Sequence, residues 1–268
     1  MHPKLRLHKW QDVTPVADAW GTPVGDLIPY FKPFWSFIMK SLSSLLISSV
    51  VLAISGTASA AVVTQWTFNT SGTALTLTPY IGTGTASYVG GTAPNGSGIA
   101  TGWVDDTTAV APVANKRWTM TTFPAASAAS GTAGAQFAVS TTGFENVVIT
   151  FGLRTSNTAS KYAQLQYSTN GTTFADFGNV IESAGGDMWN SVSRDFSSLT
   201  TTDNNSTFAF RVVSVFAPST SAYAAAGTTY AVTGTVGFDL VTVNGTAIPS
   251  PGAVALLGLA GLVARRRR

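Results

Sequence analysis

The feature that most limits the possible folds of this chain is the alternation of apolar with polar or small residues between residues 146 and 155. A period of two places the apolar side chains on one face of an extended strand and the others on the opposite face. The apolar positions are Val147, Ile149, Phe151 and Leu153. No window between residues 61 and 247 repeats its apolar residues at helical spacing, so this part of the chain is predicted to be built from β-strands.

Similar strand signals recur along the chain and together indicate roughly ten strands. After the strand predicted at 162–168, Asn170-Gly171 predicts a type I′ hairpin turn, with Phe174 and Phe177 on the return strand. Residues 217–232 show no clear period and are predicted to be a long loop. Short strands separated by turns favour an all-β sandwich over a parallel sheet. The other predicted strands are 62–68, 74–78, 102–104, 117–121, 192–196, 207–216 and 234–243.

The composition between residues 61 and 247 excludes several classes of function. The chain has no Cys, and its two histidines, His2 and His8, precede this region. Ser-His-Asp and Cys-His catalysis, haem, iron–sulfur clusters and zinc sites built on His or Cys are therefore excluded here. Six basic and nine acidic side chains give this region a balance of −3, although the whole chain carries +3. Without a basic cluster, we expect no nucleic-acid partner.

The N-terminal part contains the pattern of a secretory signal peptide at residues 39–60. Lys40 is followed by an apolar run and then by Ala58-Ser59-Ala60, which predicts cleavage before Ala61 and export by the Sec machinery. Because a signal peptide starts near the chain terminus, we expect residues 1–38 to reflect a start codon placed too early, with an extended N-terminal region as the alternative.

The C-terminal part, residues 248–268, has the order of a sorting signal. Pro249 and Pro251 interrupt regular structure, residues 252–264 are apolar or Gly, and four arginines close the chain: Arg265, Arg266, Arg267 and Arg268. A helix over 252–264 would rise only about 20 Å, which is short for a bilayer core of about 30 Å. The arginines are expected to stay on the cytoplasmic side.

This order resembles the PEP-CTERM sorting domain, although Ser250 stands where the family has Glu. The matching motif is Pro249-Ser250-Pro251-Gly252, followed by the apolar segment and the arginines. The resemblance implies recognition by an exosortase, a membrane protease, and removal of the tail. It also implies that the protein is held briefly at the inner membrane and then reaches the cell surface or the extracellular space.

Residues 61–247 resemble the jelly-roll domains of secreted bacterial proteins, including carbohydrate-binding and lamin-G-like modules. The resemblance rests on the segments 65–69, 150–156, 166–174 and 237–245. The fold class is therefore predicted as an all-β jelly-roll β-sandwich, flanked by a signal-peptide helix and a short C-terminal hydrophobic helix.

An acidic residue, Asp239, lies in the middle of the last predicted strand, where Asp is disfavoured. Strand alternation puts Asp239 on one face with Val241 and Val243, and Phe238 with Leu240 on the other, so both faces are expected to be at least partly covered. Similar jelly rolls hold a structural calcium at such an acid, which makes Asp239 and Asn69 candidate ligands. The alternative is an ion pair with Arg211 or Arg154.

Aromatic side chains near predicted loops are candidates for stacking on sugars. Trp189, flanked by Gly185-Gly186-Asp187 and Asn190, is the leading candidate, whereas Trp66 is expected in the core. The other candidates are Trp103, Trp118, Tyr88, Tyr223 and Tyr230.

We expect no enzymatic activity from this domain. The sequence favours an exported envelope or extracellular-matrix protein whose passenger domain is structural or binds extracellular polysaccharide. The alternative is a secreted, glycosidase-like hydrolase that uses only carboxylates. Its candidate residues are Asp105, Asp106, Glu145, Glu182 and Asp187.

Overall fold

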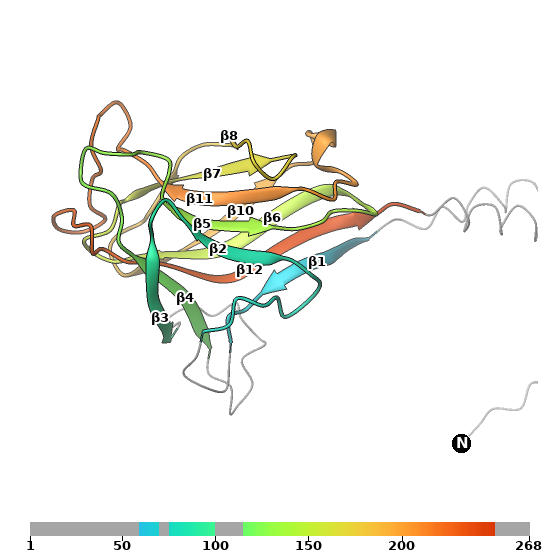
Figure 1. Cartoon of the computed structure of the whole chain (residues 1–268), viewed down its shortest axis with the longest axis horizontal. Coiled ribbons are helices and arrows are strands. Elements are labelled where there is room, and N and C mark those ends of the chain that lie inside the picture. Colours follow the sequence, from blue (N-terminus) through green and yellow to red (C-terminus); the bar gives the residue numbers. More distant parts are fainter. Residues whose placement is uncertain (1–58, 70–74, 100–114, 250–268) are drawn as a thin grey trace, which may run out of the picture. The chain divides into compact units, whose positions relative to one another are not determined.

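The computed structural model describes residues 59–69, 75–99 and 115–249 (Figure 1). These ranges contain strands and one short 3₁₀-helix, η1 (Thr200–Thr202). The strands are β1 (Ala60–Trp66), β2 (Thr85–Val89), β3 (Ala93–Ile99), β4 (Lys116–Thr121), β5 (Gly134–Ala138), β6 (Phe144–Thr155), β7 (Tyr162–Ser168), β8 (Ala175–Asp176), β9 (Ile181–Glu182), β10 (Met188–Asp195), β11 (Ala209–Ser214) and β12 (Val236–Ala247).

The strands form two antiparallel sheets. Sheet 1 has the order β10-β6-β12-β4-β3, and β1 also pairs with β12; sheet 2 has the order β2-β5-β11-β7-β8, and β9 also pairs with β7. Consecutive strands mostly alternate between the two sheets, and the sheets pack face to face (Figure 1). The prediction of an all-β jelly-roll sandwich is therefore confirmed.

Aromatic side chains from both sheets fill the space between them. Phe137 of β5 is fully buried, and its ring centroid lies 4.9 Å from that of Phe210, 5.1 Å from Trp66 and 5.7 Å from Trp118. Most of these ring pairs meet edge to face, which is the arrangement that the aromatic quadrupole favours. The predicted core position of Trp66 is confirmed, and Trp118, proposed as a possible sugar contact, is instead in the core.

Several predicted strands are confirmed, and the apolar face of β6 is buried as expected. Residues 75–78 form no strand, whereas β2, β3, β5 and β9 were not predicted. β5, Gly-Ala-Gln-Phe-Ala, has only one large apolar residue. Its partners on both sides supply the ladder hydrogen bonds, so tertiary pairing rather than local propensity makes it a strand.

The hairpin after β7 exists, but its predicted type I′ turn is wrong. Gly171 has a φ of +76°, whereas Asn170 is not in the left-handed region, and the return strand β8 starts only at Ala175. The side-chain Oδ1 of Asn170 accepts hydrogen bonds from the backbone N–H groups of Thr172 and Thr173, at 3.0 and 2.9 Å. This side-chain closure replaces the tight backbone turn with a wider loop.

The long loop predicted at 217–232 is confirmed as a segment without a strand or helix. The hydroxyl of Tyr223 donates to the carbonyl of Ala129 at 3.1 Å, and that of Tyr230 donates to the carbonyl of Pro124 at 2.6 Å. The two rings are stacked at 4.9 Å. Both residues thus hold this loop to the loop that precedes β5.

The predicted signal peptide and sorting signal fall almost entirely outside the described residues. Ala60 and Ala61 are described and belong to β1, and Pro249 is the last described residue, whereas Ala58 and residues 250–268 lie outside. In the part of the chain that the structure describes, no helix has the length and apolar character needed to cross a membrane.

Candidate functional site

The outer face of sheet 2 carries a row of polar side chains that runs across five strands. Alternation buries Phe137, Phe210 and Leu165 and turns their neighbours outward. Register places the outward residues next to one another in the order Ser87, Gln136, Arg211, Gln166 and Asp176. We call these five residues the polar row.

Three contacts fix the middle of the polar row. Arg211 Nε donates to Gln166 Oε1 at 2.5 Å, and Gln166 Nε2 donates to Asp176 Oδ1 at 2.7 Å. The guanidinium carbon of Arg211 lies 4.3 Å from the ring centroid of Phe174, within the range of a cation–π contact. Burial lowers the pKa of Arg211, and the Asp176 carboxylate partly offsets this effect.

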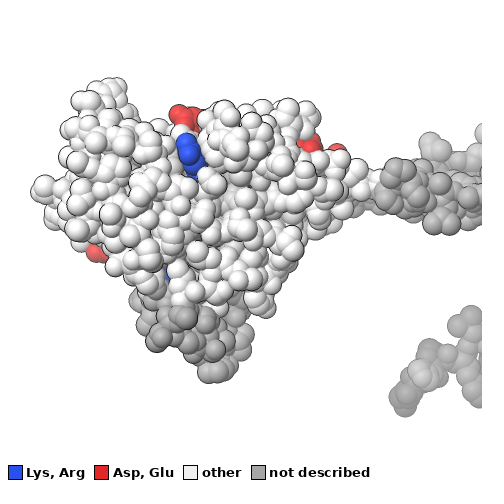
Figure 2. All heavy atoms as spheres, in the orientation of Figure 1, with Lys and Arg blue, Asp and Glu red and all other residues white. Residues whose placement is uncertain are grey.

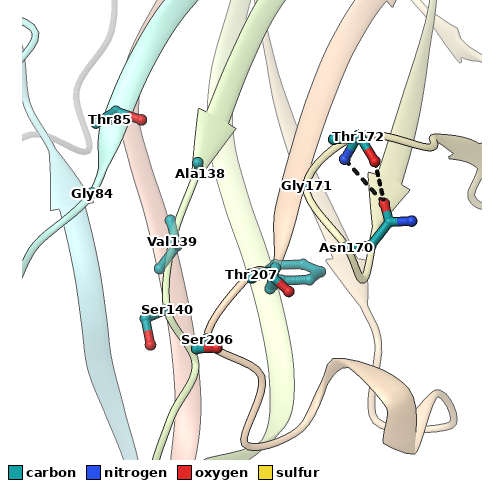
Figure 3. Close-up of a pocket in the computed structure, with 11 residues that line it drawn as sticks. Gly84, Thr85, Ala138, Val139, Ser140, Asn170, Gly171, Thr172, Ser206 and Thr207 are labelled. Carbon is teal, nitrogen blue, oxygen red and sulfur yellow. Dashed lines mark hydrogen bonds between the residues drawn. The ribbon is translucent and has the colours of Figure 1, made fainter.

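A hollow of about 400 Å³ lies beside the polar row, at the ends of the same strands (Figure 3). Two positions along each strand, about 7 Å from the polar row, a second row of paired residues faces the same side of the sheet. It consists of Thr85, Ala138, Ala209 and Ser168. Side chains with hydroxyl and amide groups surround small residues here, and the Asn170 turn forms one wall. The lining residues are Gly84, Thr85, Ala138, Val139, Ser140, Asn170, Gly171, Thr172, Ser206, Thr207 and Phe208.

The face of sheet 2 has few charges. Among the residues of β2, β5, β7 and β11, Arg211 is the only charged one. In Figure 1 these strands lie toward the viewer, and Figure 2, in the same orientation, shows a mostly uncharged surface with one basic group beside an acidic one. The arrangement places Arg211 among neutral hydrogen-bonding groups, with the carboxylate of Asp176 at the end of the polar row.

Asp239, on β12, is fully buried, as predicted, but the reasoning from simple alternation was wrong. The pairing of β12 with β6 has a bulge between Asp239 and Thr242, and Leu240 has a φ of +47°. The bulge shifts the alternation by one residue, so Phe238 and Val241 both join the core. Asp239 therefore points away from the core and is covered on the outer side of sheet 1.

The charged neighbours of Asp239 include one that was not predicted. Arg154 pairs with Asp187 at 2.7 Å, and Arg211 lies on sheet 2. Arg117 is a cation that Asp239 influences: burial lowers the pKa of Arg117, as does Arg154, whereas Asp187 and Asp239 raise it. An ion pair of Asp239 with Arg154 stays a prediction.

The groups expected to bind calcium are also engaged with the backbone. Asp239 Oδ1 accepts the backbone N–H of Leu240 at 2.8 Å, and Asn69 Oδ1 accepts that of Lys116 at 2.7 Å. Within the described ranges no three His, Cys, Asp or Glu side chains cluster as a metal site would require. Calcium binding by Asp239 and Asn69 stays a prediction.

Trp189 lies in β10 rather than in a loop, opposite Arg154 in the register, and is partly exposed. It belongs to the outer face of sheet 1, on the other side of the sandwich from the hollow. A contact of Trp189 with sugar stays a prediction.

The carboxylates considered for hydrolysis are not gathered at one place in the described part of the chain. Glu182 pairs with Lys161 at 2.6 Å, and Asp187 pairs with Arg154 and accepts a hydrogen bond from Asn157. Asp105 and Asp106 lie outside the described residues.

Sequence reasoning missed the polar row and the hollow. Gln166 and Arg211 stand at outward positions of strands that were predicted, so their exposure could have been inferred. The residue pattern within one strand does not show which strands pair with it, so the row as a whole could not be inferred. In addition, Gln136 belongs to a strand that was not predicted.

No family model and no curated protein matches this sequence. Among solved structures, the CBM22-1 xylan-binding domain of Paenibacillus barcinonensis Xyn10C is similar, with 8% identity, 61% of this chain and 87% of that chain covered, and a TM-score of 0.40. The family 11 carbohydrate-binding module from Clostridium thermocellum, in complex with a β-1,3-1,4-mixed-linked tetrasaccharide, has 11% identity, covers 62% and 91%, and has a TM-score of 0.33.

The K1 cleaved adhesin domain of the Lys-gingipain of Porphyromonas gingivalis W83 is also similar. It has 12% identity, coverages of 62% and 100%, and a TM-score of 0.34. With TM-scores below 0.5, these similarities assign neither a family nor a ligand to this chain.

Proposed function

We propose that this protein is an exported, non-enzymatic glycan-binding protein and that the outer face of sheet 2 holds the saccharide. The observation that carries the proposal is the hollow of about 400 Å³ next to the polar row on an almost uncharged sheet face. Here hydrogen-bonding groups of both kinds surround a floor of small side chains. The hollow and the polar row together are called the sheet 2 site below.

The chemistry of the sheet 2 site suits a sugar. Sugar hydroxyls donate and accept hydrogen bonds, and so do the hydroxyl and amide side chains that line the site. The small side chain of Ala138, which lines the hollow, leaves room for a ring to lie against the sheet. A protein partner would instead favour a core of large apolar side chains, which this face lacks.

Binding can be tested by a glycan array followed by calorimetry with the full chain. Ala138→Tyr should weaken binding by about tenfold or more, because the new ring would fill the hollow from an outward position that tolerates a β-forming residue. Ser193→Tyr is the matched control, since Ser193 is an exposed strand residue on sheet 1. Equal affinities of the two variants would contradict the assignment of the site to sheet 2.

Export and sorting belong to the same proposal and rest on the sequence motifs. We propose that the Sec machinery exports the chain, that the C-terminal segment holds it at the inner membrane, and that an exosortase-type protease then releases it to the cell surface or matrix. Intact-mass spectrometry of the protein recovered from the surface should show the loss of Arg265 to Arg268. Recovery of the full-length chain from a host with an active exosortase would refute this part.

A further inference from the structure

Arg211 is the one charged residue on the four strands β2, β5, β7 and β11 of sheet 2. It stands at the centre of the polar row, between Gln136 and Gln166. A partly buried cation loses hydration, which costs free energy unless another group compensates for it. Its position therefore calls for a partner.

The guanidinium of Arg211 is held so that one edge stays available. Its Nε edge donates to Gln166, and its flat face covers Phe174. Gln166 is itself fixed, because its Nε2 donates to Asp176. The two terminal nitrogens of Arg211 donate no hydrogen bond to any other described residue, and neither does the amide of Gln136 beside them.

We infer that the sheet 2 site selects glycans that carry a carboxylate, such as chains containing uronic acid, and that the terminal edge of Arg211 binds that carboxylate. The inference rests on the proposed glycan-binding function and names the ligand class. Two parallel N–H groups match the two oxygens of a carboxylate, and this paired geometry is specific to arginine. The neighbouring hollow would hold the adjoining sugar.

The nearest acidic group does not take this place. Asp176 reaches the network through Gln166 and not through the terminal nitrogens of Arg211. A merely structural Arg211 that ties β8 to the sheet would account for the Gln166 bonds. It would not produce a preference between a charged and an uncharged ligand, and this difference is the basis of the test.

The test compares pairs of ligands in which the carboxylate is either present or converted into a neutral group. Calorimetry of the full chain is carried out with oligogalacturonate and its fully methyl-esterified form, and with glucuronate-substituted xylan and its carboxyl-reduced form. In at least one pair the acidic form should bind about ten- to a hundredfold more tightly, which is the range for a hydrogen-bonded charge partner.

Variants separate local recognition from net charge. Arg211→Gln should remove the preference for the acidic form, whereas Arg211→Lys should keep only part of the preference. Arg154→Gln is the matched control, because this partly buried arginine on the outer face of sheet 1 loses the same charge on the other side of the sandwich. It should leave the preference unchanged.

Each outcome bears on a distinct claim. A preference in the wild type that Arg211→Gln abolishes and Arg154→Gln retains supports the inference. Equal binding of acidic and neutral forms in both pairs overturns it and leaves the glycan-binding function standing. Binding to no glycan, acidic or neutral, overturns both.

Discussion

The buried carboxylate of Asp239 gives a stability prediction that can be worked out from the structure. Asp239 is 0% exposed, and its Oδ1 accepts the N–H of Leu240, which has the left-handed φ at the bulge of β12. Asp239→Ala removes both this acceptor and the negative charge near Arg117. We expect it to lower the free energy of unfolding by about 3–5 kcal/mol, the range for leaving the partners of a buried charge uncompensated.

Asp239→Asn should cost less than half as much, because the amide oxygen can still accept the N–H of Leu240. In a domain of this size, 1 kcal/mol corresponds to about 2–4 °C in melting temperature. The alanine variant should therefore melt roughly 6–20 °C lower than the wild type. Glu182→Ala serves as a control, because its exposed pair with Lys161 is screened by water and should barely change the melting temperature.

Thermal melts of the full chain, followed by circular dichroism with and without a chelator, test this reasoning. A melting temperature that the chelator lowers in the wild type but not in Asp239→Ala would indicate calcium. A melting temperature that the mutation lowers and the chelator does not change would indicate that protein groups hold the carboxylate. If neither treatment changes it, Asp239 contributes nothing to stability and the argument from its burial is wrong.

Two further predictions concern the loops and the core. Burial, and to a smaller extent Tyr223, raises the pKa of Tyr230 from 10.0 to about 12, so the unfolded chain loses this proton at a lower pH than the folded chain. The free energy of unfolding should therefore fall as the pH rises from about 10 to about 12. Urea titrations at several pH values should show a shallower fall for Tyr230→Phe than for the wild type. Phe137→Ala, at the centre of the aromatic core, should lower the free energy of unfolding by about 3–5 kcal/mol in urea titrations, and a loss below 1 kcal/mol would show that the core repacks.

From the sequence, only single outward residues of the sheet 2 site could be predicted, and not the site as a whole. The outward positions of Gln166 and Arg211 follow from alternation within β7 and β11, because period two is a local property of a strand. The hollow could not be predicted, since it needs the ends of β2, β5, β7 and β11 to meet. That pairing depends on contacts between residues far apart in the chain.

The sequence by itself determined that this domain is all-β and that Trp66 and the apolar face of β6 lie in the core. These properties depend on residue type and on a period of two, which any pairing of the strands preserves. Only the tertiary structure decided where that period breaks. The bulge at Leu240 moves Phe238 and Val241 to the same face, because one extra residue in a strand reverses the direction of every side chain beyond it.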